Sequence, residues 1–186
     1  ARGTATAALS QVHGTRAARR HKKPRNKGAI VQGSSGLGVR PAPLQAAYCA
    51  AKAAVTGFTD SLRAELIADK SAVTLSVVYL PAVNTPQFGW ARTRTGRGQN
   101  APDPVFDARL CAEAILSAVE SPQREVWVGR TSLMMAAAQA VAPGLADRQA
   151  ASMWDAQLEE GERPDRTGNL FAPAPGKAAI DGRFSD

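Results

Sequence analysis

The chain has 186 residues, a formal net charge of +7 and a sequence pI of about 10. This length is sufficient for one domain with a buried core. Two cysteines, Cys49 and Cys111, are too few for a disulfide framework and favour a reducing, cytoplasmic location. No apolar run approaches ~18 residues, so we expect no membrane span, and the first residues lack a secretory pattern.

The positive charge is concentrated near the start of the chain. Residues 4–23 have a helical pattern, and Arg16 to Lys27 read RAARRHKKPRNK, with no acidic residue before Asp60. Such a stretch is typical either of a nucleic-acid contact or of a solvated helix end. Because no aromatic residue is interleaved to stack on bases, we favour the helix end and expect no nucleic-acid partner. Nucleic-acid binding through residues 16–27 stays a weaker alternative.

Residues 28–52 combine a strand, a turn, a proline-containing loop and the start of a helix. Ser35 follows the apolar run 29–31, and Tyr48 and Lys52 lie thirteen and seventeen residues later. On a helix, residues four apart share one face, about 6 Å apart along the axis. An ammonium at that distance lowers the pKa of a phenol. With a serine hydroxyl nearby, this set suits proton transfer to or from an alcohol or carbonyl oxygen.

A glycine pattern in the same stretch, Gly33-x-x-Gly36-x-Gly38, resembles a dinucleotide fingerprint. That fingerprint requires a helix directly after the last glycine, whereas Arg40-Pro41-Ala42-Pro43 intervenes here. We therefore interpret it as a flexible loop beside the substrate rather than as a phosphate site.

The remaining elements follow from hydrophobic periodicity. We expect a helix over 44–68, a parallel strand over 73–80 covered on both faces, a helix over 107–120, a strand over 124–129 and helices over 132–141 and 145–158. For the helix over 4–23, the predicted inward residues are Leu9, Val12 and Ala17. For the helix over 44–68, they are Ala47, Ala51, Val55, Phe58, Leu62 and Leu66. For the helix over 107–120, they are Leu110, Ala114, Ile115 and Val119.

Residues 5 to 130 resemble the short-chain dehydrogenase/reductase family. Ser35, Tyr48 and Lys52 fall on its Ser, Tyr-x-x-x-Lys pattern with the expected spacing. VTLSVVYLPAVNTP (73–86) resembles the next strand and its Pro-Gly…Thr loop, although Ala82 replaces the usual glycine and the threonine is one residue early. Residues 124–129 resemble the last strand of the family.

The resemblance implies an α/β fold, a partial Rossmann-like doubly wound parallel sheet with a helical C-terminal extension. Residues 1–130 would form the catalytic half, 131–158 the extension and 159–186 an irregular tail in which we find no chemistry. Nothing before Gly28 matches the half that carries the cofactor fingerprint. We therefore expect a piece of a longer enzyme that binds cofactor poorly by itself.

The resemblance also implies roles for single residues. Tyr48 would be the general acid/base, Lys52 would lower its pKa and bind the nicotinamide ribose, and Ser35 would polarise the substrate oxygen. Pro81, Val83 and Thr85 would complete the cofactor site, with Thr85 holding the nicotinamide carboxamide. The implied reaction is NAD- or NADP-dependent hydride transfer on an alcohol/carbonyl pair, without a metal.

The sequence gives less information about the substrate and the binding partners. Phe88 and Trp90 are candidates for a lid over a small, apolar substrate. Family members commonly dimerise through the helix that corresponds to 44–68, which implies a homo-oligomer. The family's relay asparagine is missing near Ala5. A catalytically inactive, oligomeric scaffold is therefore the alternative function.

Overall fold

The computed structural model describes residues 2–163, 168–174 and 178–184. Its centre is a parallel sheet of three strands, β1 (Gly28–Ser35), β2 (Val73–Leu80) and β5 (Glu125–Trp127), in the order β1-β2-β5. β1 and β2 pair along their whole length, from Gly28 opposite Val73 to Ser35 opposite Leu80. Two short strands, β3 (Ala82–Val83) and β4 (Val105–Phe106), form a second parallel pair.

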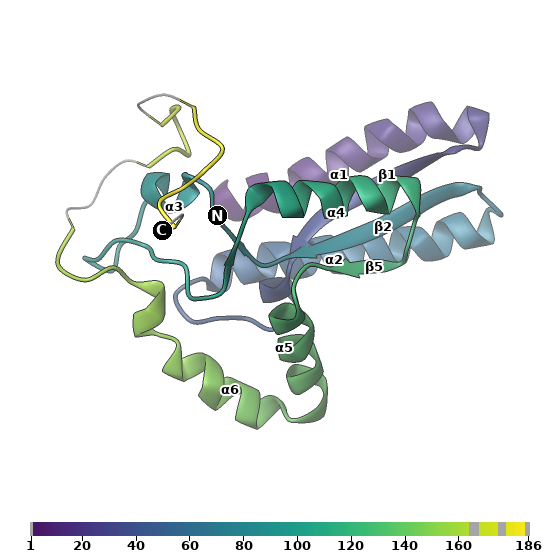
Figure 1. Cartoon of the computed structure of the whole chain (residues 1–186). Coiled ribbons are helices and arrows are strands. Elements are labelled where there is room, and N and C mark those ends of the chain that lie inside the picture. Colours follow the sequence, from purple (N-terminus) through teal and green to yellow (C-terminus); the bar gives the residue numbers. More distant parts are fainter. Residues whose placement is uncertain (1, 164–167, 175–177, 185–186) are drawn as a thin grey trace.

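Helices cover both faces of the sheet (Figure 1). α1 (Arg2–Lys22) and α2 (Ala46–Ala68) pack on one face, and α4 (Ala108–Glu120) packs on the other. α3 (Gln87–Trp90) follows the second strand, and α5 (Arg130–Val141) and α6 (Pro143–Ser152) form a pair after β5. Short 3-10 turns lie at Lys23–Arg25 (η1), Gly36–Gly38 (η2) and Asp155–Gln157 (η3). This is the α/β, Rossmann-like arrangement predicted from the sequence.

β2 contributes side chains to both hydrophobic clusters. Val73 and Leu75 join Ile30 and the α2 residues Leu62 and Leu66 on one face. Val78 lies in the other cluster, with Cys111 and Ala118 of α4 and with Val128. Successive strand side chains point to opposite faces, so a continuously apolar strand requires cover on both sides. The prediction of a doubly covered parallel strand is confirmed.

Of the residues predicted to form the inner face of α1, only Val12 is half-buried. Leu9 is 51% exposed and Ala17 is exposed, whereas Thr15 is buried and Ala18 packs on the core. The helix meets β1 through polar side chains, because Thr15 accepts a hydrogen bond from buried Gln32. Apolar periodicity cannot identify such a face.

The predicted inner face of α4 is shifted. Leu110 and Val119 are each 47% exposed, and the buried positions are Cys111 and Ala118. Ala114 and Ile115 pack against the cluster as predicted. Small side chains let α4 approach the sheet closely, so the larger ones beside them remain at the surface. On α2, the stripe is correct except for Ala47, which is exposed.

Several helix boundaries differ from expectation. α2 begins at Ala46, because Leu44 has a left-handed backbone with a φ of 66°. The predicted helix over 145–158 is instead α6, which ends at Ser152, followed by the separate turn η3.

The described part of the final segment contains no helix or strand, and it folds back onto the molecule beside α3 (Figure 1). Asp181 pairs with Arg109 at 2.7 Å. The backbone N–H of Phe184 donates to Asn84 Oδ1 at 3.1 Å, and the Phe184 ring meets Phe88 edge-on, with 5.3 Å between centroids. Among the described residues, no helix is both long and apolar enough to cross a membrane.

Candidate active site

Ser35, Tyr48 and Lys52 are brought together at the carboxyl end of β1. Ser35 is the last residue of that strand and is buried, while Tyr48 and Lys52 are half-buried in the first turns of α2. The Ser35 side chain lies close enough to the Tyr48 phenol to lower the pKa of that phenol through a hydrogen-bonding interaction. Ser35 Oγ also accepts the backbone N–H of Leu37 at 3.2 Å, which leaves its own proton for the phenol.

Lys52 is fixed by the strand as well as by its own helix. Its Nζ donates to the carbonyl of Gly33 at 3.0 Å and lies 5.7 Å from the centroid of the Tyr48 ring. The same carbonyl accepts Gln11 Nε2 of α1 at 3.2 Å. One backbone oxygen therefore connects α1, β1 and α2 directly behind the serine.

Burial dominates the pKa values of both side chains. It raises the pKa of the Tyr48 phenol above its ordinary value, the hydrogen bond with Ser35 acts in the opposite direction, and Cys49 raises the pKa further. Burial also lowers the pKa of Lys52. The sequence-based expectation of a lowered Tyr48 pKa is thus wrong for this chain, because desolvation of the phenolate outweighs the favourable effects.

The turn between Ser35 and Tyr48 is packed on both sides. Gly36 and Arg40 are buried, in contrast to the flexible loop predicted from the glycine pattern. A Cβ on Gly38 would lie 2.9 Å from the backbone carbon of Lys52, and one on Gly36 would lie 3.1 Å from the side chain of Ser132. These glycines serve close packing.

Pro81, Val83 and Thr85 lie on the segment that leaves the carboxyl end of β2. Because Ser35 is opposite Leu80 in the sheet register, this segment starts at the same sheet edge as the serine turn. Val83 belongs to β3, and the backbone N–H of Thr85 bonds the carbonyl of Val83 at 2.8 Å. Two separate segments therefore meet this edge, as parallel-sheet sites require.

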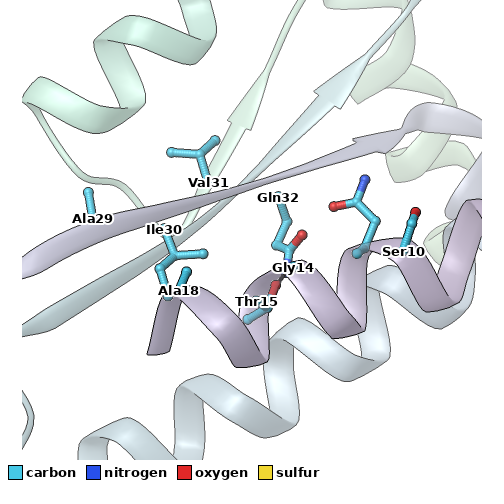
Figure 2. A pocket seen from close by; sticks show the side chains of 9 residues that line it. Ser10, Gly14, Thr15, Ala18, Ala29, Ile30, Val31 and Gln32 are labelled. Atoms are coloured by element: carbon cyan, nitrogen blue, oxygen red, sulfur yellow. Dashed lines mark hydrogen bonds between the residues drawn. The ribbon is translucent and has the colours of Figure 1, made fainter. Parts of the chain in front are cut away.

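Sequence reasoning missed the polar residues behind the site. Gln11, Thr15 and Gln32 line a groove of about 390 Å³ between α1 and β1. Figure 2 shows the labelled side chains of Gln32 and Thr15 directed toward each other. The sequence did contain a signal that Gln32 is buried. Alternate residues of a strand share one face, and Gln32 lies two residues after buried Ile30.

The fold is an α/β, Rossmann-like one, and comparisons with known proteins place it in a family. The family model described as short chain dehydrogenase matches residues 4–95. "Uncharacterized oxidoreductase YxnA" of Bacillus subtilis is 32% identical over 139 residues, covering 74% of this chain and 39% of that protein. "Putative oxidoreductase SadH" of Mycobacterium tuberculosis is 34% identical over 125 residues, covering 63% of this chain and 45% of that protein.

A solved structure is also similar. The short chain dehydrogenase from Burkholderia cenocepacia, crystallised in complex with NADP, superposes with a TM-score of 0.61 at 25% identity, covering 79% of this chain and 56% of that one. The chain belongs to the short-chain dehydrogenase/reductase family. It spans less than half the length of the two bacterial oxidoreductases that it matches.

Proposed function

We propose that this chain carries the proton-transfer centre of an NAD(P)-dependent oxidoreductase that interconverts an alcohol and a carbonyl compound. The observation that carries the proposal is the placement of Ser35 at the carboxyl end of β1 beside Tyr48, with Lys52 one helical turn further along α2 and 5.7 Å from the Tyr48 ring. The family membership supports it, and the NADP complex of the Burkholderia cenocepacia relative supports the choice of cofactor.

The three side chains have distinct roles in this proposal. In the reducing direction, Tyr48 Oη donates its proton to the carbonyl oxygen of the substrate; in the oxidising direction, the phenolate removes the alcohol proton. When substrate binds, the single Ser35 Oγ proton turns from the phenol to the same substrate oxygen and holds that oxygen beside the phenol. NAD(P), when bound, supplies or accepts the hydride.

The donor set fits such a cofactor. Lys52 carries three N–H donors, and its bond to Gly33 requires one, so donors are left for ribose hydroxyls. Thr85, Val83 and Pro81, on the neighbouring segment, would contact the nicotinamide end. The substrate would be small and apolar, with Phe88 and Trp90, both half-buried in α3, as candidate contacts.

Replacing Tyr48 with phenylalanine tests the proposal. Without the phenolic proton, NADPH-dependent reduction of medium-chain ketones by the protein expressed from its gene should fall about 10²–10⁴-fold, the usual contribution of a general acid. NADPH affinity, measured by fluorescence titration, should change little. Tyr79→Phe is the matched control, because it removes the chain's other tyrosine hydroxyl; retained turnover in Tyr48→Phe would refute the proposal.

A catalytically inactive scaffold is the second candidate. It is favoured by the raised pKa of Tyr48 and by the bond of Lys52 to a backbone carbonyl, both of which oppose phenolate formation. A scaffold need not bind NADPH, so the same titration separates the two functions. Self-association through α2 and a cytoplasmic location remain predictions.

Nucleic-acid binding is disfavoured by pairing within the basic segment. Arg19 contacts Glu65 at 3.1 Å and Asp69 at 3.3 Å, and Lys23 contacts Asp69 at 3.5 Å. These carboxylates on α2 offset part of the positive charge.

A further inference from the structure

The turn that follows Ser35 is held by residues about one hundred positions further along the chain. Arg40 lies in this turn, and its side chain is only 8% exposed. Its Nη1 donates to Gln139 Oε1 and to Asp147 Oδ1, both at 2.8 Å, and its Nη2 donates to the carbonyl of Ala146 at 2.6 Å. The acceptors come from α5 and α6.

These contacts are specific to the planar guanidinium. An Arg fork binds several oxygens in a fixed geometry, which a lysine ammonium does not reproduce. Because a buried charge without partners is strongly unfavourable, Arg40 keeps its place only while α5 and α6 keep theirs. Asp147 supplies the charge from the surface, since its side chain is 71% exposed.

Two more contacts tie the same segment to the C-terminal helices. Ser132 of α5 packs so closely on Gly36 that a Cβ there would lie 3.1 Å from its Oγ. At the other end of the loop, Gln45 Nε2 donates to Gln157 Oε1 of η3 at 2.7 Å. The connection from Ser35 to Tyr48 is thus tied to the α5–α6–η3 segment at Gly36, Arg40 and Gln45.

A short chain of bonds leads from Arg40 to the serine hydroxyl. The backbone N–H groups of Val39 and Arg40 both donate to the carbonyl of Gly36, at 3.0 and 2.9 Å. The N–H of Leu37, inside this turn, donates to Ser35 Oγ. A displacement of Arg40 therefore opens the turn that orients the hydroxyl.

We propose that Arg40, Gln139 and Asp147, which we call the Arg40 latch, let the α5–α6 helices position the Ser35 hydroxyl against Tyr48. Arg40 is a positioning residue: it acts through the turn and does not touch the reacting atoms. This inference rests on the proposed function, since the positioned groups are its proton-transfer pair. Displacements of about 1 Å in such pairs cost catalytic rate heavily.

The test does not require a known substrate. In a Tyr79→Phe background of this 186-residue chain, Tyr48 is the only tyrosine, so its ionisation can be followed by phenolate absorbance. The Ser35 hydrogen bond lowers the pKa of Tyr48, so Arg40→Lys, Arg40→Met and Asp147→Asn should move the titration midpoint to higher pH. Amide exchange at Leu37, Val39 and Arg40 should accelerate about tenfold or more, as expected when a hydrogen bond to a charged group is lost.

The matched control is Asp69→Asn, which breaks an arginine–aspartate pair at the opposite end of α2. Asp69→Asn should change neither the titration midpoint of Tyr48 nor the amide exchange in the turn after Ser35. If Arg40 variants do not fold, as judged by circular dichroism, the exposed position of Asp147 keeps Asp147→Asn usable. Faster exchange with an unchanged Tyr48 midpoint would reduce the latch to a structural contact, and no change in either would refute it.

Failure of the two proposals can be distinguished. If Tyr48→Phe retains turnover while latch variants still shift the Tyr48 midpoint, the function is wrong and the latch remains. If Tyr48→Phe is inactive and latch variants change nothing, the function stands and the latch is refuted.

Discussion

Burial and hydrogen bonding act in opposite directions on the Tyr48 phenol. Burial raises its pKa and is the larger effect, while the bond with Ser35 lowers it. A phenol that stays protonated at neutral pH is suited to donate a proton, as carbonyl reduction requires. Oxidation of an alcohol requires the phenolate and therefore depends more strongly on Ser35.

Ser35→Ala should change the pH dependence of alcohol oxidation. Loss of the hydrogen bond raises the pKa of Tyr48, so less phenolate is present at a given pH and the rising limb of kcat/KM moves to higher pH. The measurement is the pH profile of NADP reduction with a secondary alcohol.

Ser34→Ala serves as the control. Its hydroxyl bonds Thr56 Oγ1 and the carbonyl of Lys52, each at 3.3 Å, on the α2 side of the strand. Ser34→Ala should therefore leave the rising limb of the kcat/KM pH profile at the same pH. A Ser35→Ala profile that coincides with that of the parent protein would contradict the assigned hydrogen bond.

Residues close in sequence could be assigned to the site before the structure was known. Ser35, Tyr48 and Lys52 are within seventeen positions; the helix period places Tyr48 and Lys52 on one face, and the family resemblance adds Ser35 to them. The partners of Arg40 are 99 and 107 positions away. No local period connects such positions, so the latch could not be predicted.

At the scale of the element, α2 shows where periodicity is reliable. Its stripe is long and contains large apolar side chains, so the 3.6-residue period identifies Val55, Leu62 and Leu66 as buried. α1 and α4 present polar or small residues to the sheet instead. For these two helices, hydrophobicity indicates that a helix forms and does not indicate which face is buried.

Two neighbouring residues of α2 provide a matched pair for stability. Leu66 is 5% exposed in the first hydrophobic cluster, and Ile67 is 71% exposed. Leu66→Ala should lower the free energy of unfolding by about 2–5 kcal/mol, through lost burial and a residual cavity. Ile67→Ala should change it by about 0.5 kcal/mol or less. Denaturant titration measures both, and equal effects would contradict the assigned face.

For the whole molecule, the docked C-terminal segment connects distant parts of the chain. A Cβ on Gly182 would lie 2.5 Å from the carbonyl oxygen of Thr85 and 2.6 Å from Asn84 Oδ1. The exposed Arg109–Asp181 pair beside it adds little, because solvent screens it. Contact at the glycine and the Phe88–Phe184 ring pair hold this segment, together with the bond of the Phe184 N–H to Asn84 and the bonds of Arg183 to Glu159 and to the carbonyl of Gln99.

Gly182→Ala should release the segment from residues 84–88. The added methyl group cannot be accommodated against backbone, so the N–H of Phe184 should exchange faster and trypsin should cleave after Arg183 more readily. Gly144→Ala is the control, because no atom lies within 4 Å of the Cβ it adds. Equal cleavage in both variants would show that the segment is not held at Gly182.

The sequence by itself determined the three strands of the main sheet and the helices α1, α2, α4 and α5, and it pointed to the Ser35–Tyr48–Lys52 set, because these depend on spacings within one or two elements. The tertiary structure alone decided the buried face of α1, the packing of the turn after Ser35 and the tie between Arg40 and α5–α6. Those features depend on which atoms meet after the chain folds back across about one hundred residues. The tertiary structure also decided the raised pKa of Tyr48, because the effect of burial outweighs that of the interaction with Ser35.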